Sequence, residues 1–234
     1  MNQGGVPEVG LPAQRRVAVY LARFVVTLLA VGLWFWTQSL IGSRALPGSG
    51  LGDGMHGLLE PVNLYLHLHP ASTDALLIVS SFFIDALAVF LLASWTFSST
   101  SRPLLGLVLV LALRQLMQAL VALPAPPGML WRYPGFPSLL VTYGVANDFF
   151  FSGHTAVAVL GAVELARRNW RWLTVLAFSI VVFEVLTVLA LRAHYTMDVF
   201  AAILAALGAA HVSKSVAPRL DRWLSRISGG RLMP

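Results

Sequence analysis

The chain has 234 residues, of which 57% are hydrophobic and only 11% are charged, and its formal net charge is +6. A soluble domain carries about 25% charged residues, so the charges here are too few to cover a water-facing surface, and a soluble globular protein is excluded. The chain contains no cysteine, which excludes a disulfide framework and a cysteine metal site.

Six apolar stretches are long enough, or nearly so, to cross a bilayer as helices. A crossing helix needs about 20 apolar residues, and lipid offers the backbone no other hydrogen-bond partner. The stretches lie near residues 17–42, 75–97, 103–123, 149–166, 171–192 and 195–213. The sequence therefore predicts an all-α, polytopic membrane bundle of about six transmembrane helices. We expect one membrane domain over residues 1–234, with a short cytoplasmic N-terminus and a basic C-terminal tail.

Two long connections join these stretches. Residues 43–74 begin as a glycine-rich loop, and the apolar residues between Leu58 and Leu68 then predict an amphipathic helix on the membrane surface. Residues 124–148 contain five prolines and cannot form a continuous helix.

Basic residues predict the orientation of the bundle, because cytoplasmic loops are enriched in Lys and Arg. Eleven basic residues lie in the N-terminus, the 98–102 and 167–171 turns and the tail, against three on the other side. Both termini are therefore expected in the cytoplasm, and the two long connections on the exoplasmic or lumenal face. The positive net charge is therefore interpreted as an indicator of membrane orientation, and no nucleic-acid partner is expected.

Two histidine motifs open the fourth and sixth stretches. Ser152, Gly153 and His154 begin the fourth, where Ser152 is a typical helix N-cap. His194 and Asp198 begin the sixth and are four residues apart, so they share a helix face and can hydrogen-bond. A carboxylate on one imidazole nitrogen makes the other nitrogen a better nucleophile.

The topology brings these motifs together. Both stretches run from outside to inside, so His154, His194 and Asp198 are expected at one membrane face. Such a cluster suits phosphoryl or phosphodiester transfer, in which one histidine attacks phosphorus and another protonates the leaving oxygen. No metal ion or cofactor is required.

The motifs resemble those of the sphingomyelin synthase branch of the PAP2-type lipid phosphatase and phosphotransferase superfamily. Residues 148–155 match its Asp-x-x-Phe-Ser-Gly-His-Thr element, and residues 194–199 match its His-Tyr-Thr-x-Asp-Val element. Arg114, followed ten residues later by Pro124 and then by Pro-Gly-Met, is a third match. The plant phosphatidylcholine:diacylglycerol cholinephosphotransferases show similar elements.

The resemblance implies transfer of a phosphocholine-type headgroup from a donor phospholipid to the hydroxyl of ceramide or diacylglycerol. His194 would attack phosphorus and form a phosphohistidine, His154 would act as acid and then base, and Asp198 would orient His194. Substrate contacts are expected from residues around the motifs, namely Arg114, Asp148, Ser152, Gly153, Arg192 and Tyr195. The donor headgroup and the acceptor stay open.

Two alternatives differ in chemistry. A lipid phosphate phosphatase of the same superfamily usually has an arginine six residues before its final histidine and a proline before Ser-Gly-His. Val188 and Phe151 stand at those places, which argues against a phosphatase. A non-catalytic transporter or scaffold of the same fold is disfavoured because both histidines and the aspartate are present.

Charged residues within the stretches are expected to be functional or paired. We expect Arg114 either to pair with Asp85 or Glu184 or to reach the substrate phosphate. The remaining histidines, His56, His67, His69 and His211, are expected to be interfacial or incidental.

Overall fold

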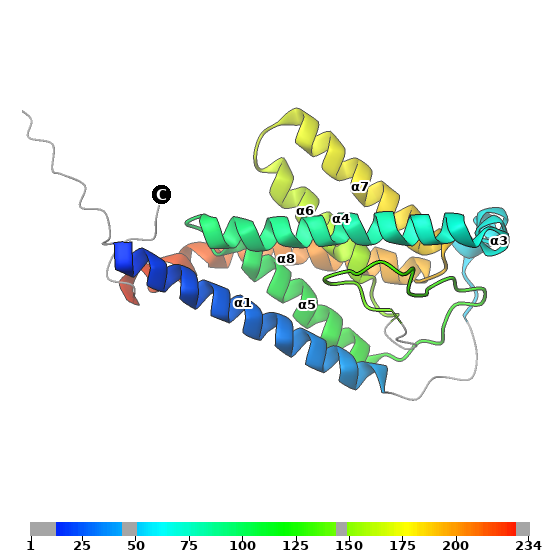
Figure 1. Cartoon of the computed structure of the whole chain (residues 1–234), viewed down its shortest axis with the longest axis horizontal. Coiled ribbons are helices and arrows are strands. Elements are labelled where there is room, and N and C mark those ends of the chain that lie inside the picture. The colour runs from blue at the N-terminus through cyan, green and yellow to red at the C-terminus, as the bar shows by residue number, and fades with distance from the viewer. Residues whose placement is uncertain (1–12, 44–50, 144–148, 228–234) are drawn as a thin grey trace, which may run out of the picture.

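A computed structural model describes residues 13–43, 51–143 and 149–227. This part of the chain forms eight α-helices and no strand (Figure 1). The helices are α1 (Ala13–Gly42), α2 (Gly54–Leu58), α3 (Glu60–Leu68), α4 (Pro70–Phe97), α5 (Arg102–Leu120), α6 (Gly153–Ala166), α7 (Arg171–Ala190) and α8 (Thr196–Ile227).

The predicted all-α, polytopic bundle is confirmed. Within the described ranges, α1, α4, α5, α7 and α8 are long and apolar enough to cross a membrane. The predicted span at 149–166 is instead the 14-residue helix α6. It is about 21 Å long, which is shorter than a hydrocarbon core of about 30 Å. The predicted span at 195–213 is longer than expected, because α8 continues through the basic segment to Ile227.

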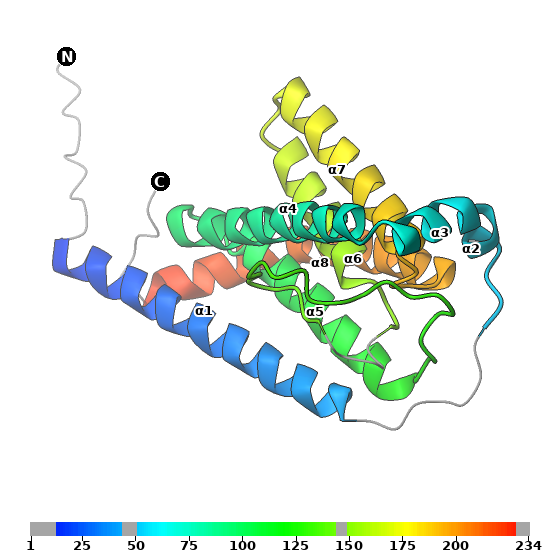
Figure 2. The ribbon, with the colours of Figure 1, turned by 45° about the vertical axis from the view of Figure 1, so that its right-hand side comes forward.

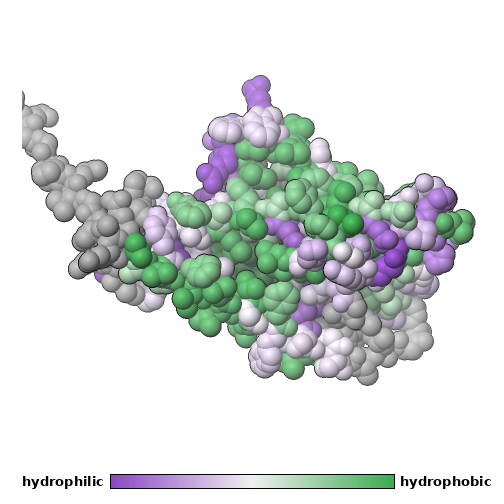
Figure 3. Space-filling model, in the orientation of Figure 1, coloured by the Kyte–Doolittle hydropathy of each residue, from purple (hydrophilic) through white to green (hydrophobic). Residues whose placement is uncertain are grey.

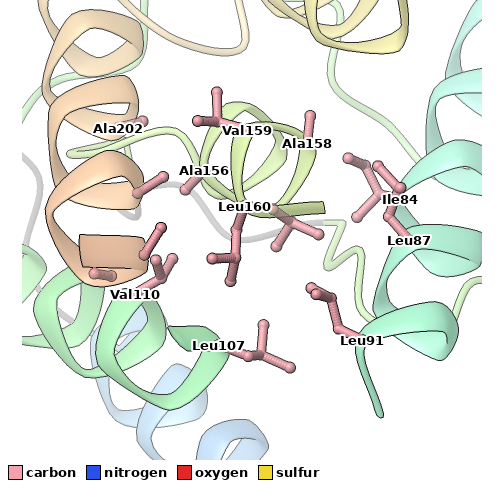
Figure 4. Packing of buried hydrophobic residues seen from close by; sticks show 14 of the residues in the cluster. Ile84, Leu87, Leu91, Leu107, Val110, Ala156, Ala158, Val159, Leu160 and Ala202 are labelled. Atoms are coloured by element: carbon pink, nitrogen blue, oxygen red, sulfur yellow. The ribbon is translucent and has the colours of Figure 1, made fainter. Parts of the chain in front are cut away.

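Helix α6 can be short because its neighbours surround it. Its side chains pack against Leu87 and Leu91 of α4, Leu107 and Val110 of α5, and Ala202 of α8 (Figure 4). Gly161 shows how closely these helices approach, since a Cβ atom at this position would lie 2.8 Å from Leu87 Cδ2. Small residues at helix contacts permit such packing in membranes. The helix that carries His154 is therefore held on all sides by protein.

The outer surface of the bundle is apolar, as lipid contact requires. Val175, Phe178, Val182 and Leu186 form an exposed row on α7, and α1 exposes most of its large apolar residues. Figure 3 shows hydrophobic residues along the flank of the bundle. Water would not stabilise this surface, and the chain is a multi-pass integral membrane protein.

The first long connection carries two helices rather than the single amphipathic helix that the sequence predicts. Asp53 caps α2, and the chain turns at Leu59 before α3, which has a proline in its first turn. Asn63 of α3 donates to the carbonyls of Gly128 and Ala190, at 3.2 and 2.8 Å. The helix thereby ties the proline-rich connection to the end of α7.

The two ends of the bundle differ. The start of α1 lies beside the end of α8, whereas α2 and α3 lie at the opposite end (Figure 2). Arg23 of α1 donates to the carbonyls of Trp95, Thr96 and Ser98 at the end of α4. A cation at a helix C-terminus satisfies carbonyls that lack partners within the helix.

Candidate active site

The two histidine motifs meet at the end of the bundle that carries α2 and α3. The backbone N–H of Ser152 donates to the carbonyl of Asp198 at 3.3 Å, so the starts of α6 and α8 are joined directly. His154 and His194 line one narrow cavity of about 50 Å³, together with Arg114, Gly153 and Trp131. The predicted convergence of the histidines is present in the structure.

The hydrogen bond made by His194 fixes its tautomer. Its Nδ1 lies 2.7 Å from the carbonyl oxygen of Phe149, and both groups are buried. A carbonyl oxygen can only accept a hydrogen bond, so Nδ1 carries the proton and Nε2 carries the lone pair. A neutral imidazole with a free Nε2 is the form that can attack phosphorus.

Asp198 does not orient His194 by the hydrogen bond that the i, i+4 spacing predicts. Its Oδ2 lies 3.8 Å from His194 Nδ1, beyond hydrogen-bond range, and accepts instead from the backbone N–H of Tyr195 at 2.8 Å. Asp198 is the third residue of α8, where a carboxylate commonly caps the first turn. Asp198 therefore holds the backbone turn that carries His194 rather than the imidazole ring.

His154 lies at the start of α6 and lines the same cavity as His194. Its ring packs nearly perpendicular to the ring of Trp131, with 5.1 Å between ring centroids. Its Nε2 is buried and has no hydrogen-bond partner among the described residues. Ser152 holds the first turn of α6, since its Oγ accepts from the N–H of Thr155 at 3.3 Å. A buried imidazole nitrogen without a partner is suited to exchange a proton with a substrate oxygen.

Arg114 reaches the same cavity from α5. Its Nε donates to the carbonyl of Phe151 at 3.3 Å, and its Nη1 donates to Oε1 of Gln38 and Oε1 of Gln118, at 3.0 and 3.3 Å. A Cβ atom at Gly153 would lie 3.1 Å from Arg114 Nε. The glycine therefore leaves room for the guanidinium beside the start of α6.

The predicted ion pair of Arg114 with Asp85 or Glu184 is wrong. Within the described part of the chain, Asp85 accepts from the backbone N–H groups of Leu139 and Leu140, at 2.7 and 3.0 Å. Glu184 accepts from Ser80 Oγ at 2.6 Å. The carboxylates thus hold the proline-rich connection and the α4–α7 contact. The other expectation, that Arg114 reaches the substrate phosphate, agrees with its place in the cavity wall.

The other expected substrate contacts divide into three groups. Gly153 lines the cavity, and Ser152 is buried as the helix cap. Tyr195 and Arg192 are not in the cavity wall. Tyr195 Oη donates to the Pro124 carbonyl at 3.2 Å, while Arg192 pairs with Glu60 and donates to the Pro127 carbonyl at 2.7 Å. Asp148 lies outside the described residues.

Asp53 and His56, which precede α3, support the segment around His194, and the sequence analysis did not predict either contact. His56, expected to be incidental, is buried, and its Nε2 donates to the carbonyl of His194 at 2.9 Å. Asp53 accepts from the N–H and Oγ1 of Thr196, and its Oδ1 also accepts from the N–H of Met55 at 2.9 Å. Their only sequence signal was an aspartate at a helix start, more than 130 residues from His194.

Asp53 should confer a pH-dependent stability. Burial raises the pKa of its carboxyl group, but hydrogen bonds from Thr196 and the His56 N–H outweigh this effect, and the pKa is lowered. The stabilisation is therefore present above the unfolded pKa of about 3.9 and is lost as the pH falls through the folded value. Asp53→Ala should lose about 1 kcal/mol of stability at pH 7, and its deficit relative to the wild type should shrink below about pH 4.

Thermal unfolding in detergent at several pH values measures this difference. Asp74→Ala is the matched control, since Asp74 pairs with Arg132 near the surface and does not contact α8. An Asp53→Ala deficit that stays constant down to the acid limit would contradict the assignment.

Comparisons with known proteins find a matching family and relatives whose names refer to membrane lipids. The family described as AtPDCT1/2 matches residues 54–215, which run from α2 into α8 and include Arg114 and both histidines. Phosphatidylcholine:diacylglycerol cholinephosphotransferase 1 of Arabidopsis thaliana is 24% identical over 219 residues, 90% of this chain and 68% of the plant protein.

A shorter likeness extends to animal proteins. Sphingomyelin synthase-related protein 1 of Homo sapiens is 33% identical over 73 residues. This alignment covers 30% of the present chain and 18% of the human protein. The protein of the same name in Mus musculus is also 33% identical over 73 residues, which cover 15% of it.

Proposed function

This chain belongs to the AtPDCT1/2 family, and from that premise we propose that it moves a phosphocholine-type headgroup between membrane lipids. The donor is a phospholipid such as phosphatidylcholine, and the acceptor is the hydroxyl of ceramide or diacylglycerol. The observation that carries the proposal is the pair of buried histidines in one cavity. His194 carries its proton on Nδ1, which leaves Nε2 as the nucleophile, and His154 Nε2 has no hydrogen-bond partner within the described part of the chain.

In the first half-reaction, His194 Nε2 attacks the phosphorus of the donor. The bond from phosphorus to the glycerol oxygen breaks, and His154 gives its proton to that oxygen, which releases diacylglycerol. The phosphocholine group stays on His194 as a phosphoramidate. The attacking imidazole becomes cationic when the phosphorus–nitrogen bond forms, and the nearby Asp198 carboxylate stabilises this charge.

In the second half-reaction, the acceptor hydroxyl enters where the diacylglycerol left. His154, now neutral, takes the hydroxyl proton, and the acceptor oxygen attacks phosphorus. The phosphorus–nitrogen bond breaks and returns its electron pair to His194. Arg114 and the N–H groups at the start of α6 stabilise the non-bridging phosphoryl oxygens in both steps.

The positive-inside pattern supports an orientation for this site. Arg102 and Arg167 form ion pairs with Glu164, and Arg168 donates to Ser94 near the end of α4. The end of α4 lies away from α3, as does the end of α8, which carries basic residues beyond residue 213 (Figure 1). The cavity therefore faces the exoplasmic or lumenal side, and the start of α1 and the end of α8 face the cytoplasm. The headgroup would be exchanged in the outer leaflet.

The test uses purified protein in vesicles with donor phospholipid labelled in its headgroup, and fluorescent ceramide or diacylglycerol as acceptor. Transfer of label to the acceptor supports the proposal, and activity should persist in EDTA because no step uses a metal. Phosphatidylethanolamine as a second donor defines the headgroup. Release of free phosphate from phosphatidic acid without transfer would instead establish the phosphatase alternative.

A further inference from the structure

Helix α8 is longer than the membrane that it crosses. Its 32 residues extend about 48 Å, whereas a hydrocarbon core is about 30 Å thick and takes about 20 helical residues. The helix begins two residues after His194, so it leaves the core near Ser215. Residues 216–227 therefore lie at the headgroup level or beyond it, at the end of the bundle away from α3 (Figure 1).

Three arginines share one face of this last part of α8. Arg219, Arg222 and Arg226 follow one another at spacings of three and four residues, and all three are exposed. Trp223 lies on the same face, four residues after Arg219, and is 57% exposed. We call these four residues the α8 arginine face. Among the residues that the structure describes, none of its arginines forms an ion pair with a carboxylate.

The opposite face of the same segment is used inside the protein. Leu220 and Leu224 line an apolar crevice together with residues of α1 and α5. Asp221 is the one carboxylate among residues 214–227. Its Oδ1 accepts from the backbone N–H of Ser101, just before α5, at 2.7 Å. The negative charge is thereby turned toward the bundle, and the outward face carries positive charge alone.

Other arginines at this end of the bundle are offset by protein groups. Arg102 and Arg167 both pair with the buried Glu164, at 2.9 and 3.2 Å. Arg23 donates to three carbonyls at the end of α4. The α8 arginine face differs from these sites, because its charge is directed away from the protein at the level where lipid headgroups lie.

Pro218 gives this segment a place to bend toward the membrane surface. It lies inside α8, one residue before Arg219. A proline inside a helix removes one backbone hydrogen bond and commonly causes a kink. A helix that bends after leaving the core lays its last turns along the surface. Long arginine side chains then keep their methylene groups at the apolar boundary and their charge among the headgroups.

We propose that the α8 arginine face binds anionic phospholipids of the leaflet that surrounds this end of the bundle. In the proposed orientation this is the cytoplasmic leaflet, whose surface potential is negative. The guanidinium groups donate to phosphate oxygens of the lipids, a geometry that suits arginine. The indole of Trp223 lies at the headgroup level, where tryptophan is enriched. The leaflet is the partner that this face meets first, because the helix leaves the core only a few residues before Arg219.

The absence of cysteine from the chain allows a fluorescent probe to be attached at one position. The Ser215→Cys variant carries a bimane one helical turn before Arg219, on the same exposed face, and is placed in phosphatidylcholine vesicles. Phosphatidylglycerol or phosphatidylcholine with a nitroxide on the upper acyl chain is then added at equal mole fraction, and quenching gives their relative affinity. The phosphatidylglycerol probe should quench more strongly. Sodium chloride should reduce the difference, because salt screens exposed charges.

Substitutions in the labelled protein test the face itself. Arg222→Gln should lower the preference for phosphatidylglycerol by about fivefold, the effect of one arginine near an anionic surface. Replacing all three arginines of the face with glutamine should abolish it. Arg171→Gln is the matched control, because it removes an exposed arginine at the start of α7, at the same end of the bundle. It should leave the preference unchanged. Quenching by the phosphatidylcholine probe should be the same in every variant.

His194→Ala should show the same preference as the labelled parent, because the α8 arginine face does not line the histidine cavity. Lipid binding is therefore tested separately from headgroup transfer. Equal quenching by the two probes in the parent would overturn the proposal, as would a preference that persists in the triple variant. An equal loss in Arg171→Gln would assign the preference to net charge and overturn the role of this face. Absence of quenching by both probes would place the segment in water, which also overturns the proposal.

Discussion

The His194→Ala variant should show no detectable headgroup transfer and should form no phosphorylated protein. Among the described residues that line the cavity, His194 is the histidine whose hydrogen bond leaves Nε2 unprotonated, while His154 is the proposed proton carrier and Arg114 is always protonated. Loss of a nucleophile that acts together with other catalytic residues reduces kcat by at least about 10⁴-fold. The measurement is incorporation of labelled phosphocholine into protein, quenched in base because phosphohistidine is labile in acid.

His67→Ala is the matched control, since His67 is an exposed histidine of α3. It should transfer at the wild-type rate. His154→Ala separates the two histidines. With a donor whose leaving group needs no proton, such as p-nitrophenyl phosphocholine, this variant should still label His194. Labelled protein in His194→Ala would overturn the nucleophile assignment.

The Arg114→Leu variant should lower kcat/KM for transfer by about 10²–10³-fold, the effect of removing one preorganised donor from a developing charge. Arg114→Lys keeps the charge but loses the planar fork that donates to Gln38, Gln118 and the Phe151 carbonyl together. It should recover only part of the activity. Steady-state kinetics with varied donor and acceptor measure both variants.

Arg132→Leu is the control for loss of an arginine. Arg132 forms an ion pair with Asp74 near the surface, at 2.8 Å, and does not line the cavity. It should leave kcat/KM unchanged, since exposed ion pairs contribute little. Thermal unfolding distinguishes a folding defect in Arg114→Leu from a catalytic one. An Arg114→Leu protein that folds and retains a third of wild-type activity would exclude a role for Arg114 at the phosphate.

The membrane-spanning helices could be predicted because the length of an apolar stretch determines whether it can cross the membrane as a helix. The ends of α1, α4 and α7 lie within about five residues of the predicted ones, since charge, proline and glycine limit each apolar run. The proximity of His154 and His194 could be predicted by counting how many times the chain crosses the membrane between them. Helix α6 was expected to be longer because its apolar residues continue back to Phe149, whereas the helix begins only after the Ser152 cap.

The contacts that orient the site could not be predicted from spacing. The i, i+4 relation of His194 and Asp198 indicated a hydrogen bond, but the backbone N–H of Tyr195 competes for the carboxylate and the Phe149 carbonyl competes for the ring. Arg114 was predicted to pair with carboxylates at a similar depth in the membrane, whereas its partners include two glutamine side-chain amides. Such choices depend on which helices are neighbours, and local sequence does not carry that information.

The backbone hydrogen bond from Ser152 to Asp198 has a stereochemical consequence. It joins the segments that carry the two histidines, so main-chain atoms set the separation between them. In the proposed mechanism, the donor and acceptor oxygens therefore use the same side of the phosphorus, which His154 serves, and His194 stays on the other side. Each displacement inverts the configuration at phosphorus, and two in succession restore it. A donor phospholipid made chiral at phosphorus by one sulfur in place of a non-bridging oxygen should therefore give a product with net retention of configuration.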